Sequence, residues 1–122
     1  MPRFTKERGP SGVLEVREGP EVVSSAESAP TGVGDGVDCA GFNTVAVAVH
    51  TLVGSPTYSL DVWLWDGHAW AQASDGAGAP AAFADMTATF SQILNVSGFD
   101  RVLLRVSAAT GTSVSRTYTF VG

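Results

Sequence analysis

The sequence predicts an all-β fold: a single β-sandwich, of jelly-roll or immunoglobulin-like type, with an extended N-terminal arm. Three observations predict it. Apolar and polar residues alternate in several short stretches, turn-forming residues recur about every 8–12 residues, and no stretch keeps the period of a long helix. With 122 residues, the chain has the length of one ordinary domain. Short alternating strands separated by frequent turns are typical of β-sandwiches and barrels.

The N-terminal part, residues 1–36, is expected to form an extended arm or linker. It contains one candidate strand at residues 13–17 and another short extended piece at 21–23. Glycine, proline and serine interrupt the rest of this part, and that composition favours loops. Compact domains seldom carry so long a segment without a use for it. Residues 37–122 are then expected to form the sandwich.

Six strands are expected in the sandwich, each with alternating residues and each bounded by turn-forming residues. Their ranges are 44–50, 57–65, 68–73, 86–96, 101–108 and 113–121. The stretch from Met86 to Leu94 is also compatible with a short helix. The dipeptide Asp66-Gly67 is a preferred centre of two-residue hairpins, so the second and third strands should pair through it.

All three tryptophans lie in one stretch, VWLWDGHAW, residues 62–70. A two-residue turn at its centre pairs Trp65 with His68 and Trp63 with Trp70. Because side chains alternate along a strand, these four residues share one face of the hairpin. The opposite face is mainly aliphatic, so we expect it to face the core, with the aromatic face pointing outward. The aliphatic residues are Leu60, Val62, Leu64, Ala69 and Ala71.

The aromatic face has three interpretations that the sequence leaves open. Large aromatic side chains anchor contacts with other proteins. Cross-strand tryptophan pairs also stabilise hairpins, each by about 0.5–1 kcal/mol, without any partner. Tryptophan rings can stack on sugars, which would make the hairpin a carbohydrate-binding surface. A reversal of the two faces would instead bury the tryptophans.

Charge disfavours nucleic acid as a partner. The formal net charge is −5 and only 16% of residues are charged, and an acidic body repels phosphate backbones. The first eight residues are the exception, because they hold Arg3, Lys6 and Arg8 against Glu7 alone. This basic leader suits an acidic partner surface, or it is a solvated tail.

No motif in the chain specifies a reaction, and we expect neither an enzyme nor a cofactor or metal ion. Cys39 is the single cysteine, so the chain can form no internal disulfide. The two histidines, His50 and His68, have no metal-binding spacing, and no nucleophile motif is present. The beginning of the sequence does not resemble a signal peptide, and no apolar run reaches membrane-spanning length. We therefore expect synthesis in the cytoplasm and no membrane partner.

Two stretches, DVWLWDGHAW (61–70) and VSGFDRVLLRVSAATGT (96–112), give the chain a resemblance to small β-sandwich proteins of tailed-bacteriophage virions. These are capsid decoration (cement) proteins and sandwich domains of tail or fibre components. The resemblance covers residues 42–121 and implies a virion protein without catalytic residues. It also implies a homo-oligomer, with a trimer favoured, and an arm that grips the major capsid protein.

Carried onto this chain, the resemblance and the aromatic face give one set of expected partner contacts. The contact residues are Arg3, Phe4, Lys6, Arg8, Val13, Leu14, Val16, Trp63, Trp65, His68 and Trp70. The alternative is a carbohydrate-binding or receptor-binding module that uses Trp63, Trp65 and Trp70.

Overall fold

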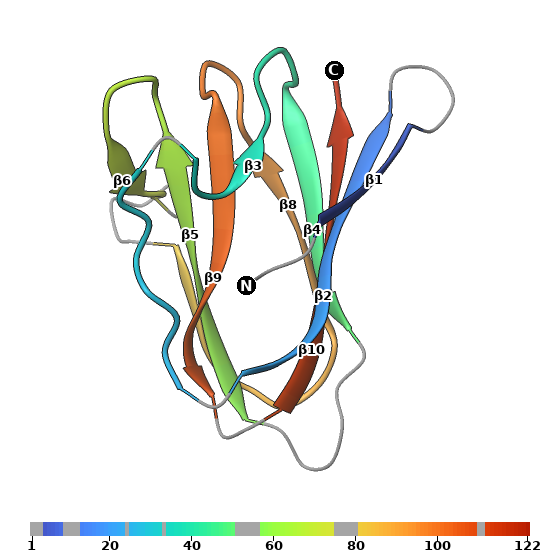
Figure 1. Cartoon of the computed structure of the whole chain (residues 1–122), viewed down its shortest axis with the longest axis vertical. Coiled ribbons are helices and arrows are strands. Elements are labelled where there is room, and N and C mark those ends of the chain that lie inside the picture. The colour runs from blue at the N-terminus through green and yellow to red at the C-terminus, as the bar shows by residue number, and fades with distance from the viewer. Residues whose placement is uncertain are drawn as a thin grey trace.

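The fold of the described residues is all-β, as the sequence predicts. The computed structural model describes residues 4–8, 13–23, 25–32, 34–50, 57–74, 81–109 and 112–122. Within them two antiparallel sheets face each other and no helix is present (Figure 1). The strands are β1 (Phe4–Arg8), β2 (Leu14–Val23), β3 (Val37–Asp38), β4 (Thr44–His50), β5 (Tyr58–Trp65), β6 (Trp70–Gln72), β7 (Ala82–Met86), β8 (Phe90–Asn95), β9 (Arg101–Ala109) and β10 (Thr112–Val121).

The two sheets are built from strands that are mostly distant in sequence. Sheet A has the order β1-β2-β10-β4-β8, and sheet B has the order β3-β9-β5-β6, with β7 also pairing with β5. In Figure 1 sheet A lies on the right and sheet B on the left. Most consecutive strands lie in different sheets, so most connections cross from one sheet to the other. Among the described pairs, only β1–β2 and β5–β6 join strands that are consecutive in sequence.

The segment expected to form an N-terminal arm contributes two strands to sheet A. The candidate strand at 13–17 and the extended piece at 21–23 are parts of one ten-residue strand, β2. This strand lies between β1 and β10, and it pairs with β10 from Leu14 to Val23 with one irregularity. Residues 14–23 therefore belong to the sandwich in the structure.

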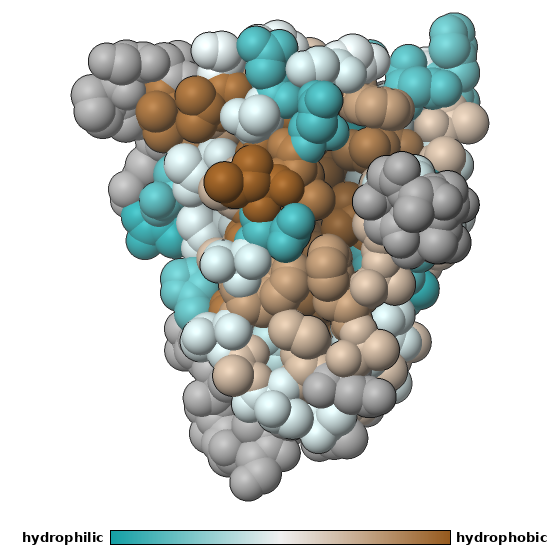
Figure 2. All heavy atoms as spheres, turned by 180° about the vertical axis from the view of Figure 1, so that it is seen from behind, coloured by the Kyte–Doolittle hydropathy of each residue, from teal (hydrophilic) through white to brown (hydrophobic). Residues whose placement is uncertain are grey.

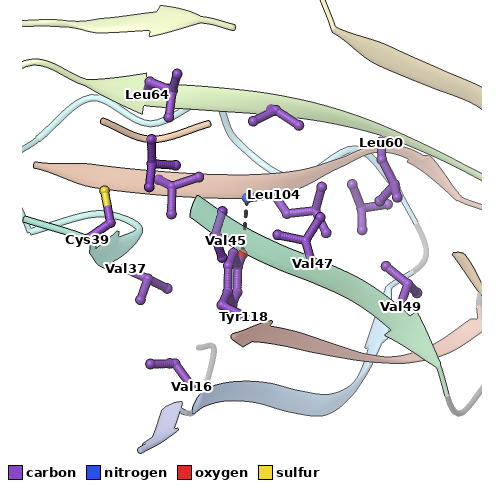
Figure 3. Close-up of a cluster of buried hydrophobic side chains, with 14 of the residues drawn as sticks. Val16, Val37, Cys39, Val45, Val47, Val49, Leu60, Leu64, Leu104 and Tyr118 are labelled. Atoms are coloured by element: carbon purple, nitrogen blue, oxygen red, sulfur yellow. Dashed lines mark hydrogen bonds between the residues drawn. The ribbon is translucent and has the colours of Figure 1, made fainter. Parts of the chain in front are cut away.

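Alternating side chains of both sheets fill the core, as Figure 3 shows. On β4, Val45, Val47 and Val49 are fully buried, and the period-2 alternation directs all three toward sheet B. Burying a side chain of this size contributes about 1.5–3 kcal/mol. The Tyr118 hydroxyl accepts a hydrogen bond from the Leu104 N–H at 3.0 Å, which joins the two sheets directly. Burial raises the pKa of the Tyr118 phenol well above its ordinary value.

The single cysteine is a core residue. Cys39 is fully buried directly after β3, and its Sγ lies 3.5 Å from the carbonyl oxygen of Phe99. Burial raises the pKa of the thiol to about 12, so the reactive thiolate is suppressed at neutral pH.

One expected strand is divided in the structure. Residues 86–96 were expected to form one strand or a short helix, but β7 ends at Met86 and β8 begins at Phe90. The helix alternative is wrong. The chain crosses between sheets here, because β7 pairs with β5 in sheet B and β8 pairs with β4 in sheet A.

Candidate functional site

The tryptophan hairpin has a four-residue loop in place of the expected two-residue turn. Trp65 lies opposite Trp70, and Trp63 lies opposite Gln72, so the expected pairs Trp65–His68 and Trp63–Trp70 are wrong. The Asp66 carboxylate explains the longer loop. Its Oδ1 accepts hydrogen bonds from the backbone N–H groups of Ala69 at 2.9 Å and His68 at 2.8 Å. These bonds lower the pKa of Asp66 below its ordinary value.

The three tryptophans still share one face of the hairpin, as predicted, but His68 does not lie on that face. A shift of two residues restores the same side of a strand, so Trp63, Trp65 and Trp70 share the outer face of sheet B. The rings of Trp65 and Trp70 lie 5.7 Å apart between centroids. All three tryptophans are half-buried, whereas the aliphatic side of β5 faces the core. His68 is exposed in the loop and belongs to neither face.

A strap, which we define as residues 25–36 without the undescribed residue 33, covers part of the aromatic face. The Trp70 indole N–H donates to the carbonyl of Gly32 at 2.9 Å. Arg101 donates from Nε to the carbonyl of Asp35 at 2.6 Å and from Nη2 to that of Gly36 at 3.0 Å. Figure 1 shows the strap running along the left side of sheet B until it enters β3.

Trp63 is held by an ion pair on the same outer face. Its indole N–H donates to Asp61 Oδ1 at 2.9 Å. Arg105 binds both oxygens of this carboxylate, at 2.9 Å from Nε and 2.6 Å from Nη2. The Arg105 guanidinium also lies 6.0 Å from the centre of the Trp63 ring, within reach of a cation–π contact. Contacts inside the chain thus engage both Trp63 and Trp70, and they leave less ring surface for a sugar.

The strap also supplies hydrogen-bond partners to backbone groups at the open edge of β9. Beyond its short pairing with β3, β9 would expose backbone groups at residues 104 and 106. Glu27 supplies partners to Val106: its N–H donates to the Val106 carbonyl at 2.9 Å, and its Oε1 accepts from the Val106 N–H at 2.9 Å. Arg116 Nη1 donates to the Leu104 carbonyl at 3.0 Å, and Tyr118 binds the Leu104 N–H. Backbone groups at such an edge require partners, and side chains supply them here.

Arg116 is the centre of this charge cluster. The side chain is fully buried, and it makes two bonds to the Glu27 carboxylate, at 2.5 Å to Oε1 and 2.8 Å to Oε2. Glu18, which is also buried, lies 3.5 Å from Arg116 Nε. Burial alone would raise the pKa of Glu27, but the hydrogen bonds and charge of Arg116 lower it below its usual value. The cluster therefore joins the strap to sheet A and β9.

The Glu27 contact predicts a loss of stability in acid. Its folded-state pKa lies below the ordinary value of 4.5, so its stabilising effect is present above pH 4.5 and disappears as pH falls through the folded pKa. We expect the free energy of unfolding to fall below pH 4.5, and Glu27→Gln to remove part of that fall. Urea denaturation of both proteins on either side of pH 4.5 measures this. An identical pH dependence in the two proteins would contradict the role given to Glu27.

A hollow of about 760 Å³ lies beneath the strap. Its lining includes the carboxyl-bearing residues Glu18, Glu27 and Asp35, together with Leu103 and Arg105. The excess of acidic groups disfavours anionic ligands there. Across the described part of the chain, no group of three or more His, Cys, Asp or Glu side chains is arranged to hold a metal ion.

The outer face of sheet A carries a second surface, which the sequence interpretation missed. Strand register places nine outward residues of β8, β4 and β10 in three rows. We call these residues the neutral face: Asn95, Thr44 and Val121; Ile93, Ala46 and Thr119; Ser91, Ala48 and Thr117. All nine are uncharged, and each is exposed or half-buried.

The neutral face has a charged border on one side. The next strand, β2, carries Glu15 and Arg17 opposite Thr119 and Thr117, and these two charged residues form an exposed ion pair at 2.7 Å. On the other side the neutral face ends at β8, where Ile93 is 72% exposed. Figure 2, the view from behind, shows hydrophobic residues in the upper half of the molecule with hydrophilic residues between them. The sequence signal for this face was the small uncharged residues, such as Thr and Ala, at every second position of 44–50 and 113–121.

The arm residues proposed as partner contacts have different surroundings. Arg3 lies outside the described residues. Phe4, Lys6 and Arg8 lie in β1, whose backbone pairs with β2 at the edge of sheet A. Val13 and Leu14 are half-buried, and Leu14 packs against the core. Val16 is fully buried, so its side chain supports the sandwich and presents no surface to a partner.

Comparison with known proteins identified no relative of this chain. The chain matches no protein-family model, no curated protein and no solved structure. No helix among the described residues is long and apolar enough to cross a membrane.

Proposed function

We propose that this protein is a structural virion protein of a tailed phage, most specifically a capsid decoration protein that stabilises the head. It acts by contact with the major capsid protein and with further copies of itself. The observation that carries this proposal is the neutral face. The resemblance of residues 42–121 to phage sandwich proteins gives the class of assembly.

The neutral face shares its lack of charged residues with the centre of a protein interface. Such centres are depleted of charged residues relative to the remaining surface. Contact with another protein chain would account for an uncharged area that spans three adjacent strands. Here the charges stop at Glu15 and Arg17 on β2, and none occurs among the nine positions beyond them. We infer that these positions lie against another protein chain.

The strand order supports a jelly-roll assignment for the sandwich. Eight strands form two four-stranded layers, β2-β10-β4-β8 and β3-β9-β5-β7, with crossings between the layers. That is the double-sheet arrangement of jelly rolls, which occur in viral capsid proteins. The hairpin that forms β6 is then an addition between β5 and β7, the fourth and fifth strands of the jelly roll.

The N-terminal strand is the second expected contact. β1 lies at the outer edge of sheet A and carries Lys6 and Arg8 in sequence. The basic residues of this strand suit an acidic capsid surface. The alternative, a carbohydrate-binding hairpin, has less support because Trp63 and Trp70 are engaged within the chain.

Particle association tests the proposal. We expect the chain in phage particles purified from the producing host, detected by mass spectrometry in a fixed ratio to the major capsid protein. Ala46→Lys puts a charge at the centre of the neutral face and should remove the chain from particles. Ala82→Lys makes the same change at an exposed position of β7 in sheet B and should leave association intact. Absence of the wild-type chain from particles would contradict the proposal, as would retention of Ala46→Lys.

A further inference from the structure

The free edge of β8 differs from the other sheet edges among the described strands. β8 is six residues long, and its pairing with β4 is continuous from Phe90 to Asn95 without a register shift. It contains no lysine, no proline and no charged residue. Natural proteins protect exposed edges with such residues, with bulges or with very short strands, because an open edge pairs with other chains.

Each of the other edges has one of these protections. β1 has the sequence FTKER and is charged over its last three residues. β3 is two residues long and β6 three, while β7 contains Asp85 and pairs with β5 through an irregular register. The open part of β9 is covered by the strap through Glu27. Residues 19–23 of β2, which extend beyond the pairing with β1, include Pro20 and Glu21. Among the described edges, β8 alone therefore lacks such protection.

The direction of the β8 backbone groups follows from one hydrogen bond. The Val96 N–H donates to the Asn43 carbonyl at 2.9 Å, directly beyond the β4–β8 ladder. In an antiparallel pair, backbone groups alternate between the two sides of the strand. The groups of Phe90, Gln92 and Leu94 then point toward β4. The N–H and C=O groups of Ser91, Ile93 and Asn95 point away from it, along the free edge.

We propose that β8 is a homodimerisation edge, at which β8 of a second copy of this chain pairs antiparallel about a two-fold axis. The register that uses all three outward residues places Ile93 opposite its own copy and Ser91 opposite Asn95. Each of these pairs exchanges two N–H···O=C bonds. The two copies of sheet A then form one continuous sheet, and the neutral faces of both copies become a single surface.

The second copy is the occupant that the chemistry of this edge fits. Residues 86–99 contain no charged residue, so two identical strands meet without repulsion. Ile93, which is 72% exposed, is removed from water by contact with its own copy on the axis. A hydrophobic residue at the centre, flanked by Ser91–Asn95 pairs that can hydrogen-bond, is self-complementary under two-fold symmetry.

This inference goes beyond the proposed function, because it concerns two copies in solution and requires no capsid. A two-fold pair also differs from the trimer that the resemblance implies, and the mass in solution distinguishes the two. Light scattering of the full chain over a concentration series should show a monomer–dimer equilibrium. Amide hydrogen exchange should show protection of Ser91, Ile93 and Asn95 that increases with protein concentration.

Two variants test the edge. Ile93→Lys places like charges opposite each other on the axis and should raise the dimer dissociation constant at least about tenfold. Ser91→Pro removes an outward N–H without removing a bond to β4, a place where strands tolerate proline, and should have the same effect. The matched control is Val22→Lys, because Val22 is 74% exposed on β2, which β10 and β4 separate from β8 in sheet A. This control should dimerise as the wild type does.

The possible results separate the two proposals. A strictly monomeric wild-type chain at all concentrations would overturn the β8 pairing. An oligomer in which the amides of Ser91, Ile93 and Asn95 exchange as fast as unpaired amides would also overturn it, and would leave contact through the neutral face standing. Exchange of the core amides of β4 verifies that each variant is folded.

Discussion

Replacing Arg116 with methionine is expected to lower the free energy of unfolding by about 3–5 kcal/mol. Methionine retains much of the side-chain length but removes the charge that the buried Glu18 and the half-buried Glu27 share. It also removes the donor to the Leu104 carbonyl at the edge of β9. Buried carboxylates that lose their counter-charge are costly, and the cost falls on the joint between the strap and sheet A. Urea denaturation followed by tryptophan fluorescence measures the change.

The control for Arg116→Met is Arg17→Met on the neighbouring strand. Arg17 pairs with Glu15 on the exposed face of sheet A, and exposed ion pairs contribute at most about 1 kcal/mol. Both substitutions remove one arginine from the same sheet, but only one removes a buried charge. Equal losses of stability in the two variants would contradict the role given to the buried cluster.

Gly36→Ala is expected to destabilise the protein by about 2–4 kcal/mol and to loosen the strap. Gly36 has a φ of 71°, which side-chain-bearing residues rarely adopt. An added Cβ would lie 2.8 Å from Trp70 Cη2 and 2.8 Å from the carbonyl oxygen of Val102. The indole could move, but the backbone oxygen of β9 cannot move without disturbing the sheet. Denaturation gives the stability, and native fluorescence should report a more solvated Trp70.

Gly34→Ala is the matched control two residues earlier in the strap. A Cβ at this position meets no atom within 4 Å, so the expected change is below about 0.5 kcal/mol. A Gly36→Ala protein as stable as the Gly34→Ala protein would show that the strap is not seated against Trp70 and β9.

The strands with strict alternation could be predicted from sequence. Residues 44–50 carry valine at every second position, and β4 has the expected bounds and faces. The inward Leu60, Val62 and Leu64 were likewise assigned to the correct side of the hairpin. In these stretches the free energy gained by burying one face outweighs the other local preferences of the chain. The alternation of residues is therefore sufficient to predict the strand and its faces.

The parts that failed depend on contacts between distant residues or on one local side chain. The hairpin register was missed because the Asp66 carboxylate binds two loop N–H groups, which a dipeptide rule does not include. β2 was divided into fragments because Glu18 and Pro20 break its apolar pattern, and the partners of the buried Glu18, Arg116 and Tyr118, lie about 100 residues away on β10. The strap looked like linker, since its anchors Arg101 and Arg116 are more than 60 residues away in sequence.

The candidate surfaces were also predicted only where a local pattern defines them. Local alternation placed Trp63, Trp65 and Trp70 on one outer face, but only the fold shows that the strap and Arg105 occupy part of that face. The neutral face combines β8, β4 and β10, which are neighbours in space and separated by long stretches of sequence. Each strand alone has ordinary outward residues, and their common lack of charge has meaning only when the strands are side by side.

In the proposed function, the neutral face of sheet A is buried against another protein in a virion. Electron cryo-microscopy of phage particles that contain the chain tests this most directly, because it shows which surface of each sandwich meets a neighbour. We expect density for a neighbouring chain over Ala46 and Ile93. A sandwich bound to the particle through other surfaces, with these two residues facing solvent, would contradict it.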